Sequence, residues 1–527
     1  MLLIALGMAC TEPVADGEAF TLNIDVQLAS NQTGLLSEVG RLDLIVEYAT
    51  GDEVYTLDTT EPGRSAEVIG VDPLSAETIS LVGYSGDEVV AFGRSTELTA
   101  RKNRVDAAIV LLRTDAFAWL ETPHDLAFGA AAGTGDGQFW ISGGSDATTS
   151  RELSANNAAL DTWWTLSLID GLTLEVKEVD GVRLPHLGEE DHRQDVTGET
   201  AGRLAHTMTH IGDGELLITG GSPGLLDCST TSRQAYVWSE GDDEPAPLDK
   251  MAQERAMHRV GELPSGNIVF IGGYGFTGET GTFLFNTDID FFDISTRSFG
   301  SNTQLLSAGP NGPGVARLGD EGVLVCGGFD YGDGSLFEVK AGCDIIGLEG
   351  AVEATTPLPI GLVYPEMVTL SDGSILATGG IALPAGTPLA NSSNDTLVAT
   401  SRAFRFKDGI WSEVAGMNNA RSLHTSALLP DGRVLVAAGA SDFGGVIYFA
   451  SPTVLPCAEL YTPSTDSWAE VGVGSCDAES ATGALPSGSW SPSIAVDDEY
   501  GVLLVGGVAG NGAAATGGAL FVSSPDL

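Results

Sequence analysis

The chain is poor in basic residues. Its 527 residues contain 24 lysines and arginines against 72 aspartates and glutamates, which gives a formal net charge of −48 at pH 7. A surface of this sign repels nucleic acid and anionic lipid headgroups, so the composition argues against both as direct partners. It favours an exported protein in surroundings where salt screens the repulsion between its own carboxylates.

Residues that carry catalysis or bind metals are also scarce. The chain has seven histidines and six cysteines, and it lacks a C-x-x-C pair and a phosphate-binding P-loop. The sequence therefore indicates no catalytic residue, no metal ligand and no cofactor. Calcium is a weak candidate at the loop 330–334, whose carboxylates do not match an EF-hand, and an ordinary turn is the alternative.

Long amphipathic helices are missing too, and only 18% of the residues are charged. Instead, a two-residue glycine step follows a short apolar run seven times. The steps begin at Gly143, Gly220, Gly272, Gly327, Gly379, Ala438 and Gly506. Repeated strand-rich units of this size are typical of a β-propeller with one blade per unit.

Each unit has a tight turn at a fixed distance before its step. Seven residues before the step stand Asp136, Asp213, Ser265, Asp320, Asp372, Asp431 and Glu499. Glycine follows each of them at the next position or one position later. An Asp-Gly pair between apolar runs favours a hairpin, because glycine accepts a positive φ. Every unit is therefore expected to contain the same hairpin, with the length differences in the loops outside it.

These units resemble the kelch repeat. Met251, Arg255 and His258 precede the turn and the step of one unit, and the same order recurs from Met417 onward. The resemblance covers roughly residues 115–527 and implies an all-β fold with a seven-bladed kelch-like β-propeller. It implies little about activity, because such propellers host binding proteins, oxidases and isomerases alike.

The ends of this region indicate how the ring closes. The last unit has no room for a final strand after 519–522, and the strand near 115–120 has no hairpin partner of its own. Pairing the two would remove both open edges. Six blades with one decayed unit is the alternative.

Residues 18–114 precede the propeller and read as a small β-sandwich, immunoglobulin-like or transthyretin-like. Leu22, Ile24, Val26 and Leu28 alternate with polar residues, as in a half-buried strand, and further segments repeat the pattern. A spacer is its simplest role.

Residues 1–17 resemble a bacterial lipoprotein signal and its tether. An apolar start is followed by Cys10 and a polar stretch, although a basic leading region is missing. The resemblance implies export, diacylation of Cys10 and a place at the outer membrane or cell surface, with membrane contact only through the lipid. An apolar start without a signal role is the alternative.

The other cysteines fit an oxidising compartment. Cys326 and Cys343 flank one loop, and Cys457 and Cys476 flank another, so two local disulfides are expected. Cys228 is left over, and the sequence does not decide its state.

Three arginines are the best binding candidates. Arg203, Arg255 and Arg421 each lie 17 residues before a glycine step, at the entry to the innermost strand. In kelch domains with known ligands, the matching arginines rim the central pocket and hold carboxylates, so the resemblance implies ligand binding here. A structural salt bridge is the alternative.

Three histidines share one position in the repeat. His206, His258 and His424 each lie 14 residues before a step. A repeated position favours a structural role, and we expect a hydrogen bond within the inner hairpin.

The preferred function is a lipid-anchored binding protein that takes a protein or glycan at the cell surface. One propeller face would carry it, with the loops 145–160, 222–235, 274–290, 329–342, 381–400 and 440–456. Whether it is an enzyme stays open, with binding favoured. The alternative is a sugar-acid enzyme resembling the kelch-type sialic acid mutarotases, and a further one is an architectural part of an envelope assembly.

Overall fold

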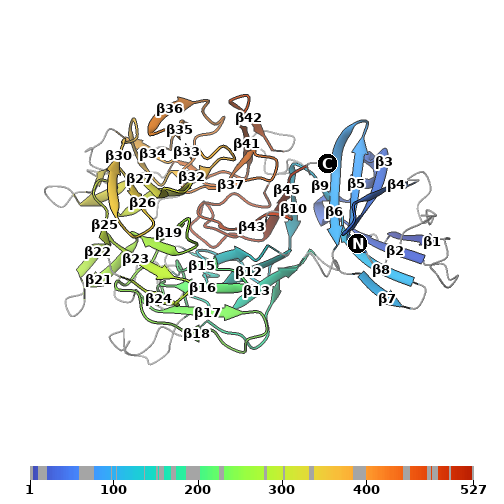
Figure 1. Cartoon of the computed structure of the whole chain (residues 1–527), viewed down its shortest axis with the longest axis horizontal. Helices are drawn as coiled ribbons and strands as arrows, with labels where there is room; N and C mark the ends of the chain where they lie inside the picture. Colours follow the sequence, from blue (N-terminus) through green and yellow to red (C-terminus); the bar gives the residue numbers. More distant parts are fainter. Residues whose placement is uncertain are drawn as a thin grey trace.

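The structure is a computed structural model, and it is nearly all β. It describes residues 4–9, 21–57, 76–95, 98–101, 104–135, 137–149, 152, 159–167, 174–184, 202–224, 231–277, 282–300, 303–331, 337–383, 399–442, 452–471, 476, 485–497 and 500–524. These residues form a small two-sheet body and a larger body of repeated sheets (Figure 1).

The small body has two facing sheets. One has the strand order β1 (Ile4–Ala9), β2 (Thr21–Gln27), β8 (Arg104–Val110), β7 (Leu98–Arg101). The other has the order β4 (Glu53–Leu57), β3 (Arg41–Tyr48), β5 (Ala76–Ser85), β6 (Glu88–Ser95), β9 (Leu112–Arg113). Two short helices, η1 (Ser30–Gln32) and α1 (Leu35–Glu38), follow β2. Alternating residues such as Ile24, Leu44 and Leu81 are buried between the sheets, as the period of two requires.

The apolar start of the chain lies in this body. Residues 4–9, assigned above to a signal, form β1 and pair antiparallel with the open edge of β2. Cys10 lies outside the described residues, so its lipidation stays a prediction. Among the described residues, no helix is long and apolar enough to cross a membrane.

The larger body contains seven sheets that share one topology. In six of them the four strands follow chain order: β11 (Ala130–Gly133), β12 (Gln138–Ser142), β13 (Trp163–Ser167), β14 (Lys177–Glu178); β15 (Thr207–His210), β16 (Glu215–Thr219), β17 (Ala235–Ser239), β18 (Ala246–Pro247); β19 (Arg259–Glu262), β20 (Ile268–Ile271), β23 (Asp288–Asp293), β24 (Ser298–Phe299); β26 (Asn311–Leu318), β27 (Gly322–Tyr331), β29 (Cys343–Ile346), β30 (Val352–Thr355); β32 (Glu366–Thr369), β33 (Ile375–Thr378), β35 (Ala403–Lys407), β36 (Ile410–Val414); β37 (Thr425–Leu428), β38 (Val434–Ala437), β41 (Ala458–Thr462), β42 (Ser467–Glu470). We number these sheets one to six. Their first strands face the middle of the body (Figure 1).

The seventh sheet joins the two ends of this region. It contains β43 (Ser493–Asp497), β44 (Gly501–Val505), β45 (Gly518–Val522) and, as its outer strand, β10 (Ala116–Leu120). β10 pairs antiparallel with β45, from Ala116 opposite Val522 to Leu120 opposite Gly518. This is the pairing expected from the sequence.

Further short strands lie outside these four-stranded paths. They are β21 (Tyr274–Thr277) with β22 (Thr282–Phe285), β31 (Gly361–Val363) with β34 (Ile381–Leu383), β39 (Ala440–Asp442) with β40 (Thr453–Val454), and the additions β25 (Thr303–Gln304) and β28 (Phe337–Val339).

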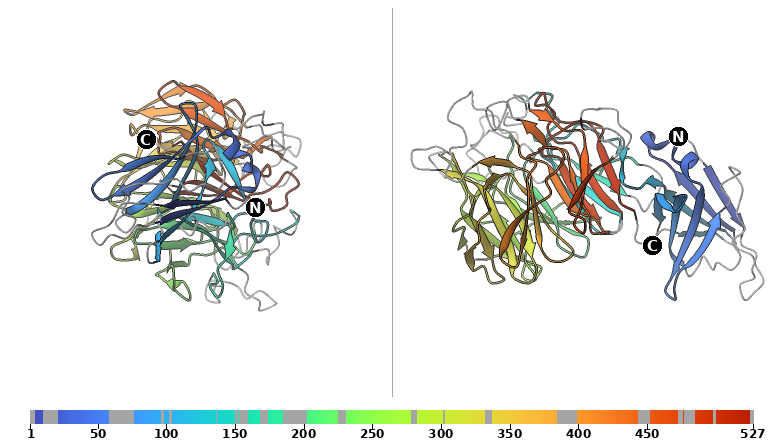
Figure 2. Two further views of the ribbon diagram at one scale, coloured as in Figure 1. Left: turned by 90° about the vertical axis from the view of Figure 1, so that its right-hand side faces the viewer. Right: turned by 90° about the horizontal axis from the view of Figure 1, so that it is seen from above.

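The small body is fixed to the seventh sheet. The side-chain amide of Asn31 accepts from Trp119 N at 3.0 Å and donates to Phe117 O at 2.9 Å, so it occupies the free edge of β10. Apolar residues from both bodies, including Val110 and Leu112, share one core with β45. Figure 2 shows the small body beside the larger one. The expected spacer is therefore held by a packed joint.

Candidate functional site

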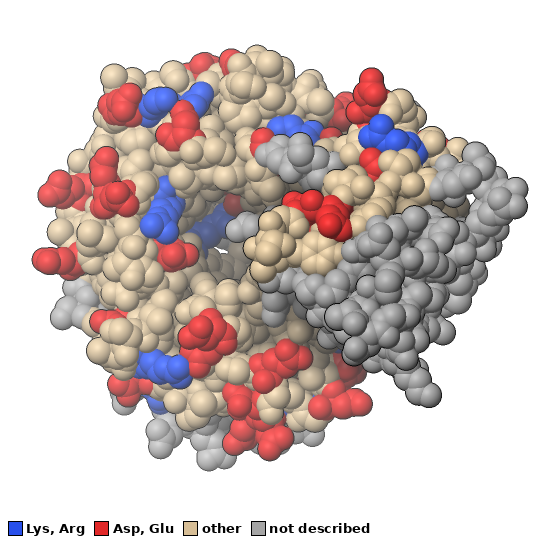
Figure 3. Space-filling model, turned by 45° about the vertical axis from the view of Figure 1, so that its right-hand side comes forward, with Lys and Arg blue, Asp and Glu red and all other residues tan. Residues whose placement is uncertain are grey.

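The first strands of the seven sheets surround a central pocket of about 410 Å³. Each of these strands, from β11 to β43, contributes lining residues. Figure 3 shows the molecule hollowed at the middle of the ring of sheets, with basic atoms inside the hollow. The pocket has the size of a site for a small molecule or for one end group of a larger ligand.

The floor of the pocket is a ring of backbone with positive φ. Seven residues at one repeat position have φ between 51° and 62°: Phe128, Ala205, Met257, Gly312, Tyr364, Leu423 and Ser491. Their peptides link successive sheets, as where Ala205 N donates to Phe128 O at 2.8 Å and Ser491 N donates to Leu423 O at 2.7 Å. Non-glycine residues adopt this conformation only where the surroundings enforce it.

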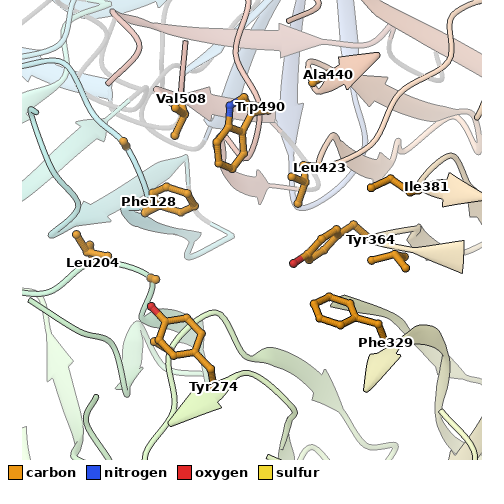
Figure 4. Packing of buried hydrophobic residues seen from close by; sticks show 14 of the residues in the cluster. Phe128, Leu204, Tyr274, Phe329, Tyr364, Ile381, Leu423, Ala440, Trp490 and Val508 are labelled. Atoms are coloured by element: carbon orange, nitrogen blue, oxygen red, sulfur yellow. The ribbon is translucent and has the colours of Figure 1, made fainter. Parts of the chain in front are cut away.

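Apolar side chains close the pocket beneath this ring. Phe128, Tyr364, Leu423 and Trp490 belong to one buried cluster, and Figure 4 shows them gathered around the centre from different sheets. The cluster is completed by residues that follow the glycine steps, such as Phe329.

The pocket opens on the face of the hairpin turns. The first strands run from the apolar layer towards the turns, and lining residues such as Thr209 and Ile494 lie further along this direction. The long loops follow the second strands and so lie on the other side of the layer. Large parts of the loops assigned above to the working surface, including 384–398 and 443–451, are outside the described residues.

One wall of the pocket is charged. Arg259 Nη2 lies 2.7 Å from Glu366 Oε1, and the two side chains are 33% and 19% exposed. Arg259 begins β19 and Glu366 begins β32, so the pair spans the first strand of the sheet between them, where the equivalent residue is Gly314. A Cβ at Gly314 would lie 2.6 Å from Met367 Sδ, so the glycine lets the neighbouring first strand β32 approach closely.

The rest of the wall carries hydroxyls and small residues. Thr207, Thr425 and Ser493 occupy the position of Arg259 in their own sheets, and Ala130 occupies it in the first sheet. Ser493 Oγ donates a hydrogen bond to Gly129 O at 2.9 Å. The pocket thus has a charged side and a neutral polar side.

The three histidines also line the pocket, but their rings point into the structure. His206 Nε2 lies 2.9 Å from Ser142 Oγ, and His424 Nε2 lies 3.1 Å from Thr378 Oγ1. His258 Nε2 lies 3.0 Å from the hydroxyls of both Thr207 and Thr219. The expectation of a hydrogen bond within the inner hairpin was wrong in its partner, because the hydroxyl partner of each histidine belongs to the preceding sheet.

This bond has a sequence signature. The residue just before the glycine step is Ser142, Thr219 or Thr378 in the sheets that precede a histidine. In the other four sheets that residue is Ile271, Cys326, Ala437 or Val505, and the next sheet carries proline or glycine in place of histidine. Histidine therefore occurs only where the preceding sheet offers a hydroxyl.

Burial keeps these histidines neutral. It lowers the pKa of His206 to about 3, helped by the charge of Arg203, and it lowers the pKa of His258 to about 3, helped by Arg255. The pKa of His424 is also lowered well below its usual value by burial. None of the three is thus a proton donor near pH 7.

These shifts predict a loss of stability in acid. An unfolded histidine takes up a proton near pH 6.5 and the folded one only near pH 3, so the free energy of unfolding falls as the pH drops through this window. Each histidine contributes a slope of about 1.4 kcal/mol per pH unit. We expect the slope between pH 6 and 4 to be smaller by about this amount in His258→Asn, measured by urea unfolding. An unchanged slope would contradict the neutral assignment.

The three arginines predicted to bind ligand do not line the pocket. Arg203, Arg255 and Arg421 are fully buried inside the sheets. Their Nη1 atoms donate to the carbonyl oxygens of Gly220 at 2.7 Å, Gly272 at 2.7 Å and Ala438 at 2.8 Å. Each arginine therefore fastens the first residue of its own glycine step.

Partners on the third strand, or directly before it, complete these contacts. Arg255 Nε donates to Asp290 Oδ2 at 2.9 Å, and Arg421 Nη2 donates to Glu459 Oε1 at 2.8 Å. Arg203 Nη2 donates to Gln234 Oε1 at 2.8 Å, and burial lowers its pKa to about 10. The geometry of Arg255 and Arg421 matches the salt-bridge alternative, within one sheet, whereas the side chain that accepts from Arg203 Nη2 is a neutral amide. Contact of these side chains with a ligand stays untested.

Both expected disulfides are confirmed. Cys326 pairs with Cys343 and Cys457 pairs with Cys476. Such bonds are typical of extracellular or periplasmic proteins. Cys228 lies outside the described residues. No group of three histidine, cysteine, aspartate or glutamate side chains in the described part of the chain could hold a metal ion.

Sequence reasoning missed Arg259 and Glu366. Both directly follow the repeated position held by His258 and Pro365. Side chains alternate between the two faces of a strand, so the residue after the repeated histidine or proline faces the central pocket. Comparing it across the seven units would have picked out these two as its charged members.

The comparisons with known proteins concern the fold. No protein-family model matches the chain, and no curated protein matches it. The solved structure of YjhT has a TM-score of 0.43 and 16% identity over 66% of this chain and 98% of its own. A fungal alcohol oxidase of the AA5 family, solved in complex with copper, has a TM-score of 0.50 and 14% identity over 77% of this chain and 75% of its own. With the repeated sheets, this second likeness supports a β-propeller-like fold.

Proposed function

We propose that the chain is an exported binding protein, a seven-bladed kelch-like β-propeller, that takes a small polar group in its central pocket. The group is either a small molecule or the end of a protein or glycan at the cell surface. Lipid anchoring through Cys10 belongs to this proposal, and the two disulfides support the export.

The observation that carries the proposal is the partly exposed pair of Arg259 and Glu366 inside the pocket. Unlike the buried arginines, Arg259 is accessible, and the described residues give its side chain one hydrogen-bond partner. A rigid ring of strands holds the pair in place, so a ligand meets a preorganised site.

The test compares two substitutions to tryptophan in the purified protein. Thr209→Trp narrows the pocket mouth, and Ser441→Trp in β39 adds the same bulk on the long-loop side. We expect ligands found in a glycan and peptide screen to lose at least tenfold in affinity with Thr209→Trp and to keep their affinity with Ser441→Trp. The reverse result would place binding on the loops.

A sugar-acid enzyme is the second candidate. It needs an arginine for the carboxylate and a proton carrier, and Arg259 and Glu366 supply both types beside hydroxyl groups. The low pKa values of His206 and His258 leave Glu366 as the carrier. Anomer exchange of a sugar acid, followed by NMR, should then be faster with the protein than with Glu366→Gln.

A further inference from the structure

The contact between Arg259 and Glu366 uses only part of the hydrogen-bonding capacity of the two side chains. A guanidinium has five N–H donors and a carboxylate has two oxygens. The contact from Arg259 Nη2 to Glu366 Oε1 is the one side-chain hydrogen bond of this pair within the described part of the chain. As far as the described residues show, further donors of Arg259 and the Oε2 atom of Glu366 therefore remain for a ligand.

Complementing these groups takes a ligand with two opposite charges. A simple carboxylate would bind Arg259 but face the carboxylate of Glu366, and the net charge of −48 repels it further. A simple amine would bind Glu366 and face Arg259. A charge that loses water without gaining a partner weakens binding, so neither ligand fits the pair well.

The floor of the pocket favours a ligand that also has an apolar part. Phe128, Met257, Tyr364 and Leu423 line the bottom of the pocket. A ligand whose charged end meets the wall therefore has an apolar surface for its other end, within a volume of about 410 Å³. Burial of that apolar end would supply most of the binding free energy, because charge contacts at an exposed ion pair contribute little.

We infer that the pocket selects an α-amino carboxylate with an apolar side chain. Its carboxylate accepts from the free donors of Arg259, its ammonium donates to Glu366, and its side chain rests on the floor. Arg259 and Glu366 are then the specificity-determining residues. This rests on the proposed function and names the class of its ligand.

Three matched probes test the inference by isothermal titration calorimetry at pH 7. Phenylalanine carries both charges, 3-phenylpropionate lacks the ammonium, and 2-phenylethylamine lacks the carboxylate. We expect phenylalanine to bind at least tenfold more tightly than either. Arg259→Gln and Glu366→Gln should each lower its affinity at least tenfold. Arg317→Gln, at the exposed pair with Glu262 outside the pocket, should leave it unchanged.

Several results would overturn the inference. One is equal affinity for the three probes. Another is no binding of phenylalanine at about 10 mM, a concentration that corresponds to a binding free energy weaker than about −4 kcal/mol. The third is an unchanged affinity in both glutamine variants when these melt at the same temperature as the parent. If a ligand from the screen still loses affinity with Thr209→Trp, only the ligand class is wrong. If that ligand is unaffected, the proposed pocket function fails with it.

Discussion

Replacing Arg255 with methionine is expected to lower the free energy of unfolding by about 3–5 kcal/mol. Both Arg255 and its partner Asp290 are completely buried. The variant leaves a buried carboxylate with Ala252 N as its remaining donor among the contacts described, and frees the carbonyl of Gly272. Urea unfolding followed by tryptophan fluorescence measures the change.

Two variants control this result. Arg297→Met removes an exposed pair with Glu215 and should cost less than about 1 kcal/mol. Arg255→Met combined with Asp290→Leu should recover part of the loss, because the unpaired charge disappears with its partner. If Arg255→Met costs no more than Arg297→Met, the arginine is not a structural fastener, and the ligand-binding prediction for it would return.

The second large effect is expected at the glycine step. Gly272 has φ of 64°, and a Cβ at this position would lie 1.8 Å from Pro310 O. Gly272→Ala therefore combines a left-handed backbone with a clash against the next sheet, and we expect a loss of about 2–5 kcal/mol.

Gly266→Ala is the matched control, since it lies in the turn of the same hairpin. Its φ of 84° imposes the same backbone cost, but a Cβ there meets no atom within 4 Å. We expect a loss of about 1–2 kcal/mol for it. Equal losses in the two variants would show that close approach between sheets does not explain the repeated glycines.

The repeated fold could be predicted from the sequence because several of its backbone positions require one particular residue type. Glycine is needed at the steps and turns, as at Gly272 and Gly266, where φ is positive. The closing strand could be found because 115–120 had no partner of its own. These are local signals, and the same position shows them in unit after unit.

The floor of the pocket left no such signal. Phe128, Tyr364 and Leu423 hold the same positive φ, yet they share no chemical type. Backbone hydrogen bonds between neighbouring sheets hold this conformation, and they join residues far apart in the sequence, such as Ala205 N and Phe128 O or Tyr364 N and Gly312 O. Local propensity cannot report them.

The sequence also did not reveal which arginines point into a sheet and which point into the pocket. Arg255 and Arg259 lie four residues apart, and the sequence pattern favoured the first as the ligand-binding residue. What separates them is Asp290, which lies 35 residues further along and draws Arg255 into the sheet. Arg259 meets Glu366 at a distance of 107 residues, in the pocket. Burial of each charge is thus decided by partners that only the fold brings near.

The most direct test is a crystal structure with the tightest ligand from the screen. The ligand is predicted to lie in the central pocket on the hairpin-turn side, in contact with the guanidinium of Arg259 and the carboxylate of Glu366. A ligand bound on the long-loop side, with the pair of Arg259 and Glu366 untouched, would contradict the proposal.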